Sequence, residues 1–576
     1  MSWEVKQLLR ERLAEEKGYY LYPLGVRSRF ALVYPNSYFV GMSNLGFHII
    51  YDLLNRRDDT FCERFFLPDK EQIKLYNKTN TPLLSLETQS MLADFSLIGF
   101  AVSFEMDYFN ILEILRMGKI QALAEKRGEK DPLIIAGGPC ATFNPEPLSP
   151  FIDAFIIGEG EETMQDFLDR YYESKAEGKT RQEILADLAK IPGVYVPAFY
   201  EHHYNNSGEL ERITVHDTIP DKVCRRWVKN LDDYPAHTVV ITDNTEFRLY
   251  LIETARGCGR HCRFCMAGYC FRKPRNRSLR VLKEELSSAK QFNKRIGLMG
   301  AAISDYPEID SLCEEIISQG MTMSVASFRA DSVTETLVSS LANSGMKTLT
   351  IAPEAGSPRM RAVINKGIEE KHIFKTIDIG LSAGIKHFRL YIMVGLPYET
   401  MGDIEEIITL VEKIRSYMAG KISGTRVTVS VNPFVPKPFT PFQWLPMADK
   451  KTIEAIYKRL MAAFKGKTDV ELLTESVKEA IIQALLARGD RRVGEALYIA
   501  HQKGGVKSFK AAVRELNIDS DQLLYRNRKE NEVFPWDVLD MGVKREYLFA
   551  ELDRAQKALL TPRCFDGCRR CGVCEQ

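Results

Sequence analysis

Residues 256–265 read RGCGRHCRFC, and this decapeptide is the most informative part of the 576-residue chain. Its cysteines, Cys258, Cys262 and Cys265, have the spacing C-x3-C-x2-C and directly follow an apolar run that predicts a β-strand. Three thiolates on one tight loop can bind three irons of a 4Fe-4S cubane and leave the fourth iron open. The alternative is a zinc knuckle, but knuckles pair their cysteines two and two. The spacing therefore predicts a 4Fe-4S cluster with one open iron.

Strand-like runs alternate with helical stretches from Leu249 onward, which predicts a partial (βα)6 barrel over residues 246–445. The six predicted strands are Leu249 to Glu253, Ile296 to Gly300, Thr322 to Ser327, Thr348 to Ala352, His387 to Val394 and Val427 to Asn432. Unusual turns follow the second to fifth strands: Gly300-Ala301-Ala302, Ser327 to Asp331, Pro353 to Ser357, and Gly395-Leu396-Pro397 with Glu399. Because such barrels carry their active sites at the carboxyl edge of the strands, we expect these turns to share one site with the cysteine loop.

The cysteine loop, with the aromatic Phe264 before its last cysteine, resembles that of the radical S-adenosylmethionine (SAM) superfamily. The resemblance implies that the amino and carboxyl groups of SAM chelate the open iron. It also implies that one electron, from a donor such as flavodoxin or ferredoxin, cleaves the sulfonium to a 5′-deoxyadenosyl radical.

The same resemblance implies which residues contact SAM. Gly300 and Ala301 would meet its amino group, although Ala302 replaces the acidic residue usual in the family. Gly395 would let the backbone approach the adenine. Polar contacts to the SAM carboxylate and ribose would come from Ser327, Arg329 and Glu354.

The first 195 residues show a βαβ rhythm that predicts a Rossmann-like domain with a parallel sheet. Its expected strands are Phe30 to Tyr34, Leu97 to Val102, Leu133 to Ala136 and Ala154 to Ile157, and Leu45 to Leu54 has helical spacing. Small residues, among them Gly137, Gly138 and Gly158, follow the last two strands at the edge where open α/β sheets bind ligands.

These glycine runs resemble cobalamin-binding domains that precede radical SAM barrels. With Tyr34 to Gly46 and the C-terminal cysteines, the resemblance to such fusion proteins covers nearly the whole chain, and it implies cobalamin as a cofactor but no particular reaction. Domains that replace the lower ligand of cobalamin use Asp-x-His-x-x-Gly, a context that no histidine has here; His48 is expected to be a helix residue. Any bound cobalamin should therefore lack a histidine axial ligand.

Three further segments complete the expected organisation: a connection at 196–245, a mostly helical domain at 446–560 and a cysteine-rich tail at 561–576. The tail contains Cys564, Cys568, Cys571 and Cys574 with the spacing C-x3-C-x2-C-x2-C, which indicates a metal site. Either an auxiliary 4Fe-4S cluster or zinc suits this spacing, and ferredoxin-like loops favour the cluster.

A dense basic stretch surrounds the cysteine loop, formed by Arg256, Arg260, Arg263, Arg272, Lys273, Arg275, Arg277 and Arg280. It could bind RNA or a phosphate-bearing substrate. Charge balance for a cluster of anionic thiolates, together with ordinary solvated arginines, is the interpretation that we favour.

The overall composition excludes some classes of protein. Lysine plus arginine (78) nearly cancels aspartate plus glutamate (77), so the net charge gives no reason to expect nucleic acid or an acidic membrane as partner. The charged N-terminus lacks the features of a secretory signal, and no apolar run approaches the ~20 residues of a membrane span. We therefore expect a cytoplasmic protein with reduced thiols.

The sequence as a whole favours a radical SAM enzyme that uses cobalamin to modify an unactivated carbon, most plausibly by methylation. A radical SAM enzyme without cobalamin, such as one that inserts sulfur into RNA or protein, is the first alternative. The second is a non-catalytic iron-sulfur protein.

Overall fold

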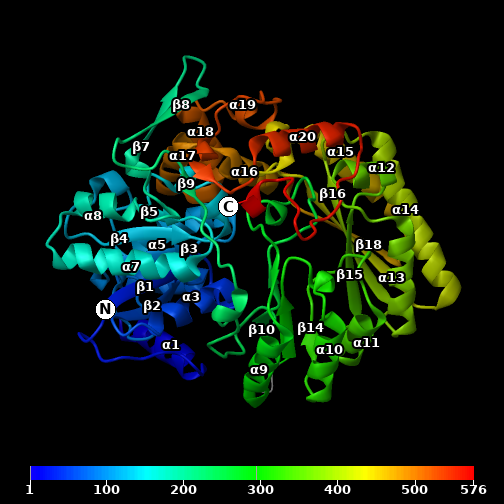
Figure 1. Ribbon diagram of the computed structural model, residues 1–576, viewed down its shortest axis with the longest axis horizontal. Helices are drawn as coiled ribbons and strands as arrows, with labels where there is room; N and C mark the ends of the chain where they lie inside the picture. Colours follow the sequence, from blue (N-terminus) through cyan, green and yellow to red (C-terminus); the bar gives the residue numbers. More distant parts are fainter. Residues whose placement is uncertain (1, 293–294, 576) are drawn as a thin grey trace.

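The computed structural model describes residues 2–292 and 295–575, and it is an α/β structure in which two parallel sheet systems lie side by side (Figure 1). The N-terminal sheet and its helices are blue to cyan, and the second system is green to yellow. Orange and red helices from the C-terminal part lie across the top of both in this view. The predicted α/β fold class is confirmed.

The N-terminal sheet has, within the described ranges, six strands in the order β2-β1-β3-β4-β5-β6, parallel except for its last pair. The strands are β1 (Ser28–Tyr34), β2 (Thr60–Phe66), β3 (Leu97–Ala101), β4 (Leu133–Gly137), β5 (Ala154–Ile156) and β6 (Val194–Tyr195). The helices are α1 (Trp3–Ala14), α2 (Tyr38–Gly41), α3 (Leu45–Asn55), α4 (Lys70–Lys78), α5 (Tyr108–Met117), α6 (Pro139–Phe143), α7 (Gly160–Ala176) and α8 (Arg181–Leu188). The four predicted strands and the helix at Leu45 are confirmed.

The sequence pattern did not reveal β2, because two charged residues interrupt its apolar run. Arg64 is fully buried, and its guanidinium pairs with Glu16 and Glu87, each at 2.6 Å. A buried charge is tolerated when it is paired in this way, so this buried edge strand can contain it.

The segment 196–245, for which the sequence predicts only a connection, contains three strands. An antiparallel hairpin joins β7 (Tyr200–Tyr204) to β8 (Leu210–Val215). The third strand, β9 (Val223–Cys224), pairs in parallel with β19 (Leu539–Asp540) near the other end of the chain. This segment therefore attaches the C-terminal part to the N-terminal half.

The second sheet system is the predicted barrel, and it is open rather than closed. One group contains β10 (Leu249–Glu253), β13 (Arg295–Met299) and β14 (Met323–Ser324). The other contains β15 (Thr348–Glu354), β16 (His387–Val394), β17 (Arg426–Pro433) and β18 (Val470–Thr474), and a parallel bridge between Phe328 and Ile351 links the groups. The surrounding helices are α9 (Leu279–Ala289), α10 (Ile309–Ser318), α11 (Glu335–Asn343), α12 (Pro358–Val363), α13 (Glu370–Ser382) and α14 (Met401–Lys421).

All six predicted barrel strands are present, although the third is much shorter than expected. The sequence did not predict β18, which follows the helix α15 (Lys450–Phe464) and adds a strand beside β17. It lies in the segment expected to be helical, because its alternating, mostly exposed residues (VELLT) give only a weak strand signal.

The C-terminal helices are α15 (Lys450–Phe464), α16 (Val477–Arg488), α17 (Arg491–Gln502), α18 (Phe509–Glu515), α19 (Ser520–Leu524) and α20 (Arg545–Gln556). They bridge the two halves. The Asn144 amide of the N-terminal half donates to the carbonyls of Ala487 and Gly489 at 3.0 and 2.9 Å. In the ranges that the structure describes, no helix is both long and apolar enough to span a bilayer.

Candidate active site

The cysteine loop leaves the carboxyl end of β10 and returns before α9. Its neck is a short antiparallel ladder between β11 (Ala255–Arg256) and β12 (Arg275–Asn276). Gly257, beside this neck, has φ +80°, and a Cβ there would lie 2.0 Å from the Phe271 carbonyl oxygen. Only glycine fits this position, so the neck fixes where the loop begins.

The three loop cysteines are close enough for their charges to interact. Burial, together with the charges of the neighbouring Cys262 and Cys258 thiolates, raises the pKa of Cys265 to about 12. Three thiolates crowded together in a buried site need a cation, and bound iron would supply it. The donor set therefore fits an iron-sulfur cluster.

A single metal ion suits this loop less well. In the part of the chain that the structure describes, no three cysteine, histidine or carboxylate side chains are grouped as ligands of one ion. A cubane binds each thiolate to a different iron, so its ligands are spread more widely than those of zinc.

Side chains from three other barrel turns meet the loop. The Arg329 guanidinium lies 3.8 Å from Cys262 Sγ and donates to the Lys366 carbonyl at 2.6 Å. The Lys366 ammonium pairs with Glu354 at 3.1 Å and lies 5.9 Å from the centre of the Phe264 ring. The structure thus brings together Cys262, Phe264, Arg329 and Glu354, which the sequence placed in one site. The assignment of Ser327 to this site stays a prediction.

The turn after β16 is built around a partly buried acid, Glu399. Gly395 has φ +73°, and its N–H donates to Glu399 Oε2 at 2.6 Å. Burial raises the pKa of Glu399 to about 8. The carboxyl group at this edge is therefore mostly protonated at neutral pH.

A cavity of about 510 Å³ lies between the N-terminal sheet and the barrel. From the barrel side it is lined by Gly257 of the cysteine loop and by Gly300 and Ala301 after β13. From the N-terminal side its lining includes the ends of β3, β4 and β5: Ala101, Ser103, Gly137, Gly138, Pro139 and Gly158. Two sets of predicted site residues, far apart in the sequence, therefore face one space.

Comparison with known proteins agrees with this geometry. Residues 252–411 match the family described as "Radical SAM superfamily", and residues 46–197 match "Radical SAM proteins, N-terminal". The chain is 31% identical over 498 residues to "Uncharacterized protein MJ0966" of Methanocaldococcus jannaschii, covering 85% of this chain and 94% of that protein. The chain belongs to the radical SAM superfamily.

Two more distant similarities accompany this result. The radical SAM enzyme is 24% identical over 294 residues to "Uncharacterized methyltransferase PH0819" of Pyrococcus horikoshii, covering 49% of this chain and 58% of that protein. A solved structure of the radical SAM methyltransferase TsrM from Kitasatospora setae, with cobalamin and a [4Fe-4S] cluster bound, aligns at a TM-score of 0.49 and 13% identity. That alignment covers 85% of this chain and 99% of TsrM.

Two glycines that line the cavity of the radical SAM enzyme are required by backbone packing, which the sequence did not reveal. Gly138 and Gly158 have φ +102° and +106°, and a Cβ there would lie 2.7 Å from Val102 O and 2.1 Å from Arg226 O. The packing of the chain against itself therefore requires glycine at both positions. A bound ligand is therefore not needed to explain why glycine stands at these two positions.

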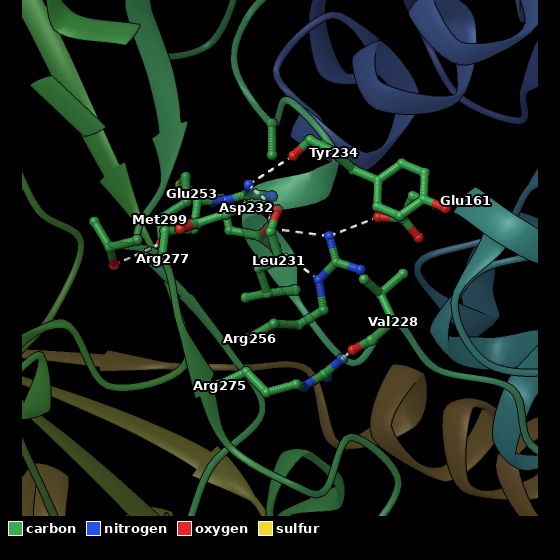
Figure 2. A network of polar contacts seen from close by, with 12 residues as sticks. Glu161, Val228, Leu231, Asp232, Tyr234, Glu253, Arg256, Arg275, Arg277 and Met299 are labelled. Atoms are coloured by element: carbon green, nitrogen blue, oxygen red, sulfur yellow. Dashed lines mark hydrogen bonds and ion pairs between the residues drawn. The ribbon is translucent and has the colours of Figure 1, made fainter. Parts of the chain in front are cut away.

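The basic stretch of the radical SAM enzyme is largely buried and ion-paired. Arg256 pairs with carboxylates of both halves: with Glu159 at 3.1 Å, Glu161 at 2.7 Å and Glu253 at 2.9 Å. Figure 2 shows Arg256 between Glu161 and Glu253. The other paired members are Arg260 with Asp305 and Asp331, Arg263 with Glu551, Arg275 with Glu159, Arg277 with Glu253, and the exposed Arg280 with Glu284. Paired, buried arginines are not available to RNA phosphates, so this stretch gives no support to an RNA-binding surface.

His48 is a core residue of α3, as expected. Its Nε2 lies 3.0 Å from the Met42 carbonyl oxygen, and its Nδ1 accepts from the Val240 N–H at 3.4 Å. Burial lowers the pKa of His48 to about 4. Among the described residues that line the cavity, none is a histidine.

The sequence did not identify Lys366, which connects Glu354, Arg329 and Phe264. The only available signal was the turn Asn365-Lys366-Gly367, in which Asn365 and Gly367 both have positive φ. The sequence also did not show that the tail reaches the cysteine loop. The Cys564 N–H donates to the Gly259 carbonyl at 2.7 Å.

Proposed function

We propose that this radical SAM enzyme uses cobalamin to modify an unactivated carbon, by methylation. The observation that carries the proposal is the shared cavity: the cysteine loop and the Gly300 turn face the carboxyl edge of the Rossmann-like sheet across it. Open α/β sheets bind ligands at that edge, and barrels do their chemistry at the corresponding edge of their strands. Two cofactors held on opposite walls could therefore act on one substrate.

We assign the cluster to Cys258, Cys262 and Cys265. When bound and reduced, the cluster supplies the electron that cleaves SAM. Arg329 donates toward Cys262 Sγ and holds the Lys366 turn through its carbonyl, so it orients both the cluster ligand and the Glu354–Lys366 pair. We assign the SAM contacts to the groups at this edge, namely Gly300, Ala301, Ser327, Arg329, Glu354 and Gly395.

We assign cobalamin to the N-terminal wall of the cavity, around Gly137, Gly138 and Gly158. When bound, cobalamin supplies the methyl group. The lining suits a large neutral ring, because three of its four charged members, Glu159, Glu161 and Glu253, each pair with the fourth, Arg256. Because none of the described lining residues is a histidine, the protein would hold cobalamin without a histidine ligand. The name of the related protein PH0819, a methyltransferase, supports the reaction type.

We further propose the domain limits 1–195, 196–245, 246–445, 446–560 and 561–576.

We also propose a cytoplasmic location. All twelve cysteines, each within the described ranges, are unpaired thiols, which agrees with a reducing compartment.

The cavity assignment is tested by filling the space. Ala101 lines the cavity from the end of β3. We expect Ala101→Phe to reduce the cobalamin retained after reconstitution at least tenfold, measured by corrin absorbance, while SAM cleavage to 5′-deoxyadenosine by the reduced protein persists. Ala176→Phe, at an exposed position at the end of α7, is the matched control. Wild-type protein that retains no corrin would remove the cobalamin assignment but leave the radical SAM assignment intact.

A further inference from the structure

The cysteine-rich tail is ordered by contacts with the loop that carries the first cluster. The Thr561 N–H donates to Asn365 Oδ1 at 2.8 Å, and the same Asn365 amide donates to the His261 carbonyl at 3.1 Å. Three residues later, the Cys564 N–H donates to the Gly259 carbonyl. The tail has too few apolar residues for a core of its own, so these contacts hold it in place.

The tail cysteines form a compact group. Cys568 and Cys571 are each 2% exposed. The four cysteines fall within eleven residues, and the backbone that carries them is held in place. The Cys568 N–H donates to the Phe565 carbonyl at 3.1 Å, and the Cys571 carbonyl accepts from the Lys544 N–H at 2.9 Å. A segment of sixteen residues is too short to bury thiols in a core of its own. A bound metal would account for their burial.

A buried cation to which no described carboxylate is paired faces this group. Arg272 is 1% exposed, and within the described residues none of its three guanidinium nitrogens has a hydrogen-bond acceptor. Among the groups around Arg272, the Cys571 sulfur has the strongest electrostatic interaction with it. A second guanidinium, Arg570, donates to Cys568 Sγ at 3.2 Å. Burying an unpaired charge is costly, and neutral thiols would not offset that cost.

We propose that Cys564, Cys568, Cys571 and Cys574 bind a second 4Fe-4S cluster, which receives an electron from a soluble low-potential one-electron donor and passes it to the loop cluster. Anionic thiolates on such a cluster would supply the missing counter-charge for Arg272 and Arg570. A single zinc ion fits less well, because the tail, like the cysteine loop, has no described group of ligands arranged around one ion.

The position of the tail suits electron transfer. Cys564 is hydrogen-bonded to Gly259, the residue directly after the loop ligand Cys258, whereas Gly257 on the other side of Cys258 faces the cavity. The tail also reaches solvent, because Cys574 is exposed. In each transfer one electron leaves the donor, reduces the tail cluster and then reduces the loop cluster; no bond is made or broken, and no proton is needed.

Metal content tests the site. The full chain is reconstituted anaerobically with iron and sulfide, as wild type and as two variants in which alanine replaces either the three loop cysteines or the four tail cysteines. We expect about eight irons per chain in the wild type and about four in each variant, since each cluster contains four irons. Cys224→Ala, at an exposed cysteine outside both groups, should retain all of them. If the loop variant instead contains no iron, or one zinc, the tail cluster is overturned.

Two further measurements test its role and do not depend on cobalamin. With titanium(III) citrate, a small reductant, the tail variant should still cleave SAM, whereas with reduced flavodoxin its rate should fall at least tenfold below that of wild type. Equal rates with flavodoxin, or equal loss with both reductants, would overturn the relay. Arg272→Met keeps every cysteine, and because it removes a buried positive charge it should shift the potential of the tail cluster, followed by EPR, to more negative values. An unchanged potential would contradict the proposed charge pairing.

Discussion

Glu399, at the carboxyl edge of the barrel, has a carboxyl pKa well above that of an ordinary glutamate. Burial raises the pKa of Glu399 to about 8 from an ordinary value of 4.5, the Gly395 N–H lowers it, and Asp403 raises it. Between these two pH values the folded protein keeps a proton that the unfolded chain has released. This contribution to stability is fully present below pH 4.5 and is lost as the pH rises through 8.

We therefore expect Glu399→Gln to flatten the dependence of the unfolding temperature on pH. Glutamine can accept the same Gly395 N–H but cannot ionise, so the unfolding temperature of the variant relative to wild type should be higher at pH 8.5 than at pH 5. Thermal unfolding at the two pH values measures this, with the exposed Glu335→Gln as control. An equal difference at both pH values would contradict the burial of an ionisable carboxyl at this turn.

At the scale of elements, α20 holds the cysteine loop from the C-terminal part of the chain. Glu551 of α20 pairs with Arg263 at 3.0 Å, and both side chains are almost fully buried. The same guanidinium donates to the carbonyls of Ala362 and Val363, each at 2.9 Å, and of Leu559 at 2.7 Å. Arg263 therefore connects the loop, α12 and the end of α20.

Removing the counter-charge should weaken this connection. We expect Glu551→Gln to cost about 3–5 kcal/mol of stability, because it leaves a buried guanidinium without a carboxylate. Denaturant unfolding measures the loss. Glu546→Gln, on an exposed position of the same helix, should change stability by less than about 0.5 kcal/mol. Similar small effects in both variants would mean that the backbone carbonyls alone satisfy Arg263.

At the scale of the whole molecule, ion pairs hold the two halves together beside the cavity. Glu159 and Glu161 come from the N-terminal half, and Glu253, Arg256 and Arg275 come from the barrel. Figure 2 shows Glu161 on one side of Arg256 and Glu253 on the other. Burial alone would raise the pKa of Glu159, but Arg275 and Arg256 lower it, so the carboxylate stays charged. The halves are thus joined by charges that neither half could bury alone.

We expect Arg256→Met to lower the unfolding temperature and to loosen the two halves. It leaves Glu161 and Glu159 with less compensation in a buried place, at a cost of about 3–5 kcal/mol. Scanning calorimetry should show a broader or split transition, as for two units that unfold separately. Arg280→Met is the matched control, because its exposed pair with Glu284 contributes less than about 1 kcal/mol. A single unshifted transition would contradict the role of Arg256.

The sequence by itself determined the cysteine spacing, the six barrel strands, four strands of the N-terminal sheet and the turns at their ends. All of these are properties of residues within a few positions of one another, where periodicity and turn chemistry act. It could not show β2, whose buried Arg64 finds its partners Glu16 and Glu87 only after folding.

Tertiary structure alone decided what the arginines do, which turns share a space and where the tail lies. Arg256 and Glu159 are 97 residues apart in the chain, and Arg263 and Glu551 are 288 apart. Such pairs depend on how elements pack, and no local pattern encodes them. Several of the basic residues that the sequence allowed as an RNA surface are therefore buried and form ion pairs. The cavity, in turn, depends on the two sheet edges facing each other.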